Sequence, residues 1–333
     1  MTFKKPAGTT MPTTRRGLAG LAAGLLPLPA LAQRNTTRLV VPYTPAGLTD
    51  VLGRALAQGL TQQLGQTVVV ENRPGANTII GTQAVAQATA DGTTMLMASG
   101  ASIVLNPLLY KQLPYDAERD LAVLGVICET PLVMVVNDAL PVRSVAEFIA
   151  YARQREGAMN YASVGMGNPI HLAAELFSIG TGLRMTNVVF AGSAPALLSL
   201  AAGDVQVMFD VISTSLPLIR DGRLRALAVT TRERLEILPE VPTVAESGVP
   251  GYVATTWFGL AVPKQTPAPA AERLRAALAA VQSEAGFVRR FGELGLLMQP
   301  PRDAAGVARY LGEERTRWGG VIQARGISLG SAP

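Results

Sequence analysis

Short apolar strands alternate with helices along almost the whole chain after its first 32 residues, and this alternation limits the fold more than any other feature. Runs such as Arg38–Tyr43 and Gln66–Glu71 are rich in β-branched residues, whereas Asp50–Gly65 carries apolar residues at helical spacing. Strands separated by helices of this length form βαβ units with parallel sheets. The sequence therefore predicts an α/β fold.

The pattern divides into two sets. The first set has strands at 38–43, 66–71 and 93–98 with helices at 50–65 and 79–88, and the second runs from about 131 to 230. An extended run at 252–263 and three helical segments at 266–285, 286–299 and 304–324 follow. The first set has too few helices to cover its sheet, so we expect this tail to pack back on it. This predicts a discontinuous domain, 33–130 plus 250–333, and a second domain, 131–249, joined by two crossing strands near 126–137 and 252–262.

The first 32 residues have the pattern of an export signal. Lys4, Lys5, Arg15 and Arg16 precede an apolar run that ends at Ala30-Leu31-Ala32, a small-x-small cleavage pattern. The paired arginines also resemble a twin-arginine signal in part. We expect cleavage after Ala32 and export of the mature protein. An uncleaved membrane anchor is the other interpretation, but the run is short and interrupted by proline.

Charge and residue counts exclude several classes of function. Residues 1–32 contain 4 of the 29 Lys and Arg and none of the 24 Asp and Glu, so residues 33–333 carry a net charge of 25 − 24 = +1. This charge gives no indication of nucleic-acid binding. Cys128 is the single cysteine and His171 the single histidine, which leaves too few residues for a disulfide framework or a zinc site. We expect no cofactor and no metal.

Three strand–turn–helix junctions are built from the same kinds of residue, and their sequences are YTPAGLTD, SVGMGNPIH and FAGSAPA. Each puts glycine, hydroxyl or amide groups at a helix N-terminus, where free N–H groups and the helix dipole favour an anion. MASGAS, at the end of another strand, adds a fourth small polar segment. In open α/β sheets such junctions lie at the carboxyl edge, where ligands bind. The alternative is that these glycines and prolines only make turns.

The chain resembles the extracytoplasmic solute receptors of tripartite tricarboxylate transporters, the Bug or TctC-like proteins. ENRPGAN, ADGTTMLMAS, GSAPALLSLAAGDVQVMFD, LPEVPTVAESG and WFGLAVPKQTP carry the resemblance, in order, through most of the chain. It implies a two-domain periplasmic binding protein fold, type II-like, in which each domain is a doubly wound sheet and closure of the domains traps a solute. The implied partners are a small organic carboxylate and large and small integral membrane subunits. The receptor is expected to be a monomer and not an enzyme.

The junctions and the resemblance together give a set of candidate ligand-binding residues. They are Tyr43, Thr44, Ala46, Gly47, Thr49, Asp50, Ser99, Ser163, Gly165, Gly167, Asn168, His171, Gly192, Ser193, Ala194 and Asp210. The sequence departs from the family pattern at Ala46, where a glycine is usual, and at Phe190-Ala191, where a tyrosine–lysine pair is usual. These departures leave the ligand range open.

Three candidates have alternative roles. Asp50 lies in the first turn of a helix, where it either caps the helix or accepts a proton from the solute. His171 is expected to be neutral, because the positive helix end disfavours imidazolium, and it either contacts solute or makes a structural hydrogen bond. Asp210 either contacts ligand or holds a loop.

Rival functions lack their motifs. NYASVG has no first glycine of a nucleophile elbow, GMGNPI is not GxGxxG, and no Walker A lysine occurs. An exported sensor that presents its solute to a signalling partner would have the same cleft, so the sequence leaves that alternative open.

Overall fold

The structure is a computed structural model that describes residues 1–2 and 36–332. The predicted export signal and its cleavage after Ala32 lie outside the described residues, apart from Met1 and Thr2. Asn35–Pro333 forms one compact unit. Within the described part of this unit, ten strands join one sheet in the order β2-β1-β3-β10-β5-β8-β6-β7, with β11 and β9 also paired to β5.

The first half of this sheet contains three parallel strands, two antiparallel strands and part of β5. Its strands are β1 (Thr37–Val41), β2 (Val68–Asn72), β3 (Thr94–Ser99), β10 (Thr255–Pro263), β11 (Leu297–Met298) and residues 121–131 of β5 (Leu121–Asn137). Its helices are α1 (Leu48–Leu64), α2 (Ile79–Ala86), the π-helix η1 (Ala101–Leu105), α3 (Asn106–Leu109), α4 (Ala117–Asp120), α9 (Ala268–Gln282), α10 (Ala285–Gly292) and α11 (Ala304–Arg325). A small separate sheet pairs β4 (Tyr110–Gln112) with β12 (Leu329–Ser331).

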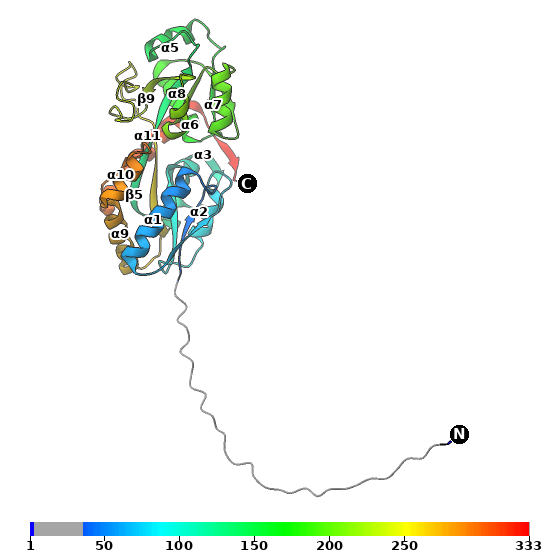
Figure 1. Cartoon of the computed structure of the whole chain (residues 1–333), viewed down its shortest axis with the longest axis vertical. Helices are drawn as coiled ribbons and strands as arrows, with labels where there is room; N and C mark the ends of the chain where they lie inside the picture. The colour runs from blue at the N-terminus through cyan, green and yellow to red at the C-terminus, as the bar shows by residue number, and fades with distance from the viewer. Residues whose placement is uncertain (3–35, 333) are drawn as a thin grey trace. The chain divides into compact units, whose positions relative to one another are not determined.

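The second half uses residues 132–137 of β5 together with four further strands. These are β6 (Asn160–Ser163), β7 (Thr186–Val189), β8 (Val207–Val211) and β9 (Leu224–Val229). Its helices are α5 (Val145–Arg153), α6 (Pro169–Thr181), α7 (Ser193–Ala202) and α8 (Ile212–Arg220). Figure 1 shows α5, α7 and α8 at one end of the unit and α1, α9 and α10 at the other.

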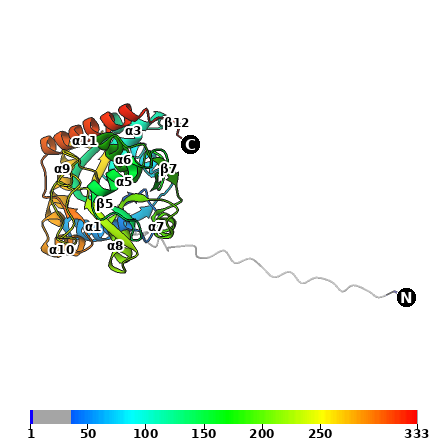
Figure 2. The ribbon, with the colours of Figure 1, turned by 90° about the horizontal axis from the view of Figure 1, so that it is seen from above.

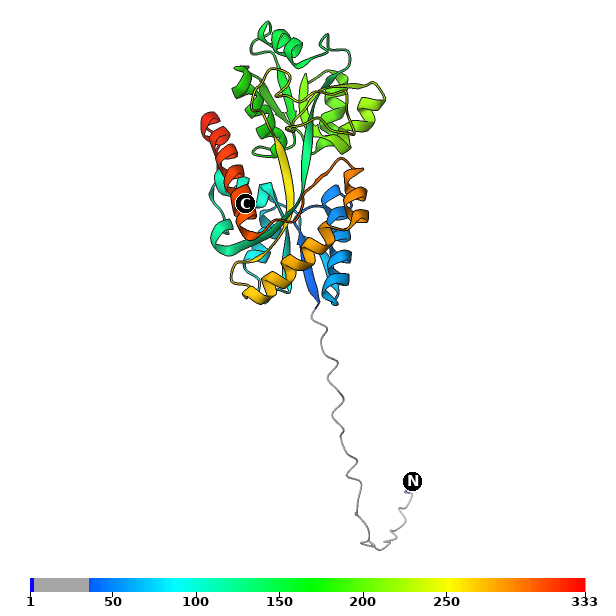
Figure 3. The ribbon, with the colours of Figure 1, turned by 90° about the vertical axis from the view of Figure 1, so that its left-hand side faces the viewer.

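Both halves are doubly wound. In the first half β1 lies between β2 and β3, and in the second β6 lies between β8 and β7, so the helical connections leave a central strand in both directions. This arrangement confirms the predicted fold class. The two halves are joined by β5 and β10, which Figure 3 shows running from one group of helices toward the other.

Local sequence signals explain most helix ends. Asn168 accepts a hydrogen bond from the Ile170 N–H at 2.9 Å and Pro169 takes the first helical position of α6. Gly65 ends α1 with φ +66°. Most predicted elements are present, but the helix predicted over 286–299 is wrong beyond Gly292, because Gly295 turns the chain with φ +82° and Leu297–Met298 forms β11. The segment 100–120, with η1, α3, β4 and α4, carries more structure than its sequence pattern indicated.

The tail helices pack in two ways. α9 lies on α1, where a Cβ added to Gly59 would come within 2.6 Å of Val281 Cγ2, and Arg273 donates to the Leu64 carbonyl at 2.6 Å. α11 instead runs along one side of the unit (Figure 2) and also contacts α6 of the second half, where Arg325 pairs with Glu175. The last tail helix therefore bridges both halves of the sheet.

Candidate functional site

The strand directions decide which loops face one another. β3 and β5 are both antiparallel to β10, so β3 runs toward the second half and ends at Ser99, opposite Phe258. β8 is antiparallel to β5 and runs toward the first half, ending with Val211 opposite Leu132. β1 is parallel to β3, and β6 and β7 are parallel to β8. The carboxyl ends of both parallel sets therefore point at the place where β5 changes partners, near Pro131.

The first loop is exposed and has a strained backbone. Thr44, Ala46 and Gly47 are exposed, and Ala46 has φ +65°, a conformation that a side chain disfavours. Gly47 is the N-cap of α1 and provides no side-chain cap, while Thr49 is buried in the first turn. Free N–H groups of the first turn are thus left for an external acceptor.

Asp50 holds this loop in place. Its Oδ2 accepts from the Ala46 N–H at 2.9 Å and from Arg54 Nε at 3.0 Å, and its Oδ1 accepts from Asn72 Nδ2 at 2.8 Å. Burial raises the pKa of the carboxyl, but the bonds from Arg54, the Ala46 amide and Asn72 together lower it below its usual value. None of these three donors is an N–H group of the first turn of α1, so Asp50 does not take the predicted capping role; it holds the loop that precedes the helix.

Tyr43 and Ser99 join the first loop to the end of β3. The Tyr43 hydroxyl donates to Ser99 Oγ at 2.9 Å, and the Ser99 N–H donates to Ser102 Oγ at 2.9 Å. Burial raises the pKa of Tyr43 to about 12, against the opposing bond to Ser99. Tyr43 is therefore a neutral hydroxyl group that links two predicted segments.

The second loop, between β6 and α6, closes on itself. Gly165 and Gly167 have φ +143° and +73°, and the Gly167 N–H donates to His171 Nδ1 at 3.1 Å. His171 is buried, and Asn168 caps the helix. Ser163 Oγ is buried and has no hydrogen-bond partner in the structure.

The surroundings of His171 keep the ring neutral. Burial lowers its pKa, the Arg325 guanidinium adds to this, and the Glu175 carboxylate opposes it. The ring stacks on Tyr161, whose hydroxyl donates to Glu175 at 2.5 Å. The hydrogen bond from Gly167 requires an unprotonated Nδ1, so the structure favours a structural role for this nitrogen.

The third loop is held by a buried carboxylate. Asp210 accepts hydrogen bonds from the hydroxyls of Ser193 at 2.6 Å, Thr214 at 2.6 Å and Ser215 at 2.8 Å. Burial raises the pKa of Asp210, and these hydroxyls oppose the rise. Gly192 has φ 165°, extended backbone, and Ala194 is exposed.

The structure thus brings the predicted residues into two groups at facing strand ends, one around Tyr43 and Ser99 and one around Ser163 and Asp210. One contact ties the second group to the first half: a Cβ added at Gly167 would lie 2.4 Å from Leu109 Cδ1 in α3. Sequence reasoning missed the residues that hold the loops. These are Arg54, Asn72, Thr214 and Ser215. The i,i+4 spacing of Asp50 and Arg54 was the one usable signal.

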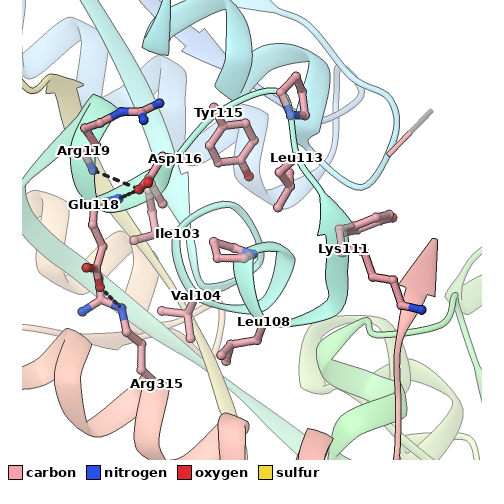
Figure 4. Close-up of a pocket in the computed structure, with 14 residues that line it drawn as sticks. Ile103, Val104, Leu108, Lys111, Leu113, Tyr115, Asp116, Glu118, Arg119 and Arg315 are labelled. Atoms are coloured by element: carbon pink, nitrogen blue, oxygen red, sulfur yellow. Dashed lines mark hydrogen bonds and ion pairs between the residues drawn. The ribbon is translucent and has the colours of Figure 1, made fainter. Parts of the chain in front are cut away.

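Cavities also lie away from these loops. One of about 570 Å³ is formed by η1, α3, the segment after β4, and Arg315 of α11. Figure 4 shows Ile103, Leu113 and Tyr115 around it, with the Glu118–Arg315 ion pair at one side. Another, of about 400 Å³, lies beside β5 and β10 near Glu129 and Thr255. Neither cavity is lined by a predicted site residue.

The described residues offer neither a cluster of metal ligands nor an activated thiol. No group of three or more His, Cys, Asp and Glu in residues 1–2 and 36–332 is arranged to hold a metal ion. Cys128 is buried, and burial raises the pKa of its thiol, which keeps the thiol in its unreactive form. No described helix has the length and apolar character needed to cross a bilayer.

Two doubly wound halves joined by paired strands, with facing carboxyl edges, define the class of periplasmic binding proteins. The chain belongs to the tripartite tricarboxylate transporter family receptor group, TctC, whose family model matches residues 52–327. It is 36% identical over 296 residues to Protein BugT of Bordetella pertussis, covering 88% of this chain and 90% of BugT. It is 34% identical over 319 residues to a UPF0065 protein of Pseudomonas sp. strain P51, and the match covers 92% of this chain and 93% of that protein.

Solved structures agree with this assignment. Rpa4515 of R. palustris, solved with adipate, has a TM-score of 0.79 and 36% identity, over 88% of this chain and 98% of that one. MatC of Rhodopseudomonas palustris, solved with bound malate, has a TM-score of 0.75 and 29% identity, over 86% and 98%. The periplasmic binding protein BugD has a TM-score of 0.73 and 28% identity, over 88% and 98%. Family and fold are those of solute-binding proteins, not of enzymes.

Proposed function

We propose that this protein is a periplasmic receptor that captures a small organic carboxylate and delivers it to a membrane transporter of the tripartite tricarboxylate type. The observation that carries the proposal is the facing of the two carboxyl edges, with loops at the ends of β1, β3, β6 and β8. In related receptors solved with adipate and with malate the ligand is a carboxylate.

The proposed binding site lies between two domains, 33–130 plus 250–333 and 131–249. β5 and β10 act as the hinge, because each continues from one half of the sheet to its junction with the other. Closure about these strands brings the loops together over the solute. Delivery to a membrane partner then requires the domains to reopen.

In this site the first loop receives a carboxylate. The Gly47 cap leaves N–H groups of α1 free, and Asp50 fixes the loop without occupying them. Backbone amides hold an anion moderately tightly, which suits a solute that must be released. Export by a signal at 1–32, with cleavage after Ala32, would bring the mature protein to the periplasm.

A panel of small acids tests the binding function. Thermal shift of the mature protein is measured with mono-, di- and tricarboxylates, followed by calorimetry of each acid that raises the melting temperature. At least one carboxylate is expected to bind while the matching amides and alcohols do not. A panel without any binding acid would contradict the proposal. Uptake of that acid by cells with and without the receptor gene tests the transport role.

A further inference from the structure

Two large apolar side chains are exposed at the carboxyl end of β6 and β7. Met166, in the loop before α6, has 48% of its surface exposed, and Val189, the last residue of β7, has 52%. Asn187 Nδ2 lies 3.3 Å from Met166 Sδ, which holds the loop against β7. Asn187 and Val189 are two residues apart on β7 and share a face, so Met166 and Val189 lie on either side of Asn187 and form one group, the β6–β7 apolar patch.

Buried polar atoms without partners lie within the same group. Ser163 Oγ and Asn187 Oδ1 are inaccessible and have no hydrogen-bond partner in the structure. The register pairs Tyr161 with Asn187 and Ser163 with Val189, and the two-residue period of strands puts these side chains on one face. Because both atoms are inaccessible, neither offers a hydrogen bond to a solute that rests on the patch.

The loop that carries Met166 offers little to a second negative charge; the free N–H groups of this half lie instead at the N-terminus of α7, where Gly192 provides no side-chain cap. The N–H groups of Gly167 and Ile170 already donate to His171 and Asn168. The described segments 163–171, 189–194 and 210–215 contain no Lys or Arg, and the Asp210 carboxyl lies behind Ser193. A second carboxylate here would lose hydration without gaining a cation.

We infer that the solute is a carboxylate with an uncharged alkyl or aryl body, whose apolar end packs on Met166 and Val189 while its carboxylate faces the Thr44–Gly47 loop. This inference rests on the proposed function and narrows it from acids in general to amphipathic monocarboxylates. Met166 and Val189 are then the residues that determine specificity. An unbranched side chain such as Met adapts to alkyl and aryl shapes alike.

Two matched series of acids test the inference by calorimetry on the wild-type mature protein. Butanoate, hexanoate and octanoate are compared with succinate, adipate and suberate, which have the same chain lengths with a second carboxylate. Hexanoate is expected to bind more tightly than adipate. Affinity in the monocarboxylate series should rise up to about fourfold per buried methylene, until the patch is covered. Benzoate and phthalate extend the comparison to aryl acids.

The outcomes separate this inference from the function on which it rests. Tighter binding of the dicarboxylates than of their monocarboxylate partners would overturn the inference and leave the carboxylate receptor standing. Binding of none of these acids, nor of any acid in the wider panel, would overturn both. Affinity that does not change with chain length would also contradict contact with an apolar patch.

Two substitutions assign the effect to the patch. Met166→Gln keeps side-chain length and Val189→Thr keeps shape, and each is expected to weaken hexanoate binding several-fold while changing succinate binding less than twofold. Ile179→Gln is the matched control, because Ile179 is 41% exposed but lies near the far end of α6. Equal losses for Ile179→Gln and Met166→Gln would contradict the assignment.

Discussion

The amide N–H of Gly167 donates a hydrogen bond to Nδ1 of His171, the single histidine of the chain, at 3.1 Å. Because burial keeps the pKa of His171 below its ordinary value, of about 6.5, the unfolded chain takes up the proton more readily than the folded one. Stability is therefore expected to fall as the pH is lowered below about 6.5. Urea unfolding at pH 7.5 and 5.5 measures this loss, and His171→Gln should reduce it.

The comparison between wild type and His171→Gln is needed because a second group titrates in the same range. Burial raises the pKa of Glu314 to about 6, so the folded protein holds this proton more tightly than the unfolded chain. The stability that Glu314 contributes is therefore lost as the pH rises from its unfolded pKa through 6, which is opposite in sign to the effect of His171. Glu314 is present in both proteins and cancels in the difference. An identical pH dependence for the two would show that His171 does not titrate on unfolding.

Gly47→Val tests the first loop. A Cβ at Gly47 would meet only the Thr44 carbonyl, at 3.7 Å, and φ −77° suits any residue, so stability should change by less than about 1 kcal/mol. The side chain would, however, block the approach of an anion to the amides of α1, and binding should be abolished. Calorimetry with the tightest acid of the panel measures this, with Gly286→Val, in open space in α10, as control. Wild-type affinity would exclude this loop from the site.

Ala46→Gly is expected to stabilise the protein, because Ala46 has φ +65° where glycine carries no Cβ penalty. The gain should be about 1 kcal/mol in the free energy of unfolding. Ala55→Gly, in the interior of α1, is the matched control and should cost about 1 kcal/mol. Equal losses in both variants would contradict the strained conformation of this loop.

Gly167→Ala and Leu109→Ala test the contact between α3 and the second loop. Gly167→Ala combines a positive φ with a 2.4 Å overlap on Leu109 and should cost about 2 kcal/mol or more. Leu109→Ala alone leaves a cavity at a buried site and should cost about 2–5 kcal/mol. The double variant removes the overlap, so its loss of stability should be smaller than the sum of the losses of the two single variants. Simple additivity would indicate that the two residues do not touch.

Much of the fold could be predicted because its signals are local. Asn168 and Pro169 begin α6, Gly65 ends α1, and apolar spacing marks the helices between. β5 was harder to predict as one strand, because Pro131 falls in its middle. Pro131 lies where β5 changes from β10 to β8 and β9, and there the missing N–H is tolerated.

The candidate site was less predictable, because its geometry depends on partners distant in sequence. The Asp50 carboxylate accepts a hydrogen bond from Asn72, at the end of β2. The pKa of His171 depends on its burial, on Glu175 and on Arg325 near the end of the chain. The segment 100–120 shows the same limit, since short apolar runs do not distinguish a π-helix from a strand. The ligand contacts of all these loops stay predictions.

The position of β10 has a consequence for the order of folding. This strand lies between β3 and β5, yet it is contributed by residues 255–263, far downstream of both neighbours. A growing polypeptide therefore cannot complete its first sheet until more than three quarters of the chain has been synthesised. Until then, β3 and β5 each have an edge without a paired strand. Premature termination before residue 255 would leave both neighbouring strands open to association with other chains.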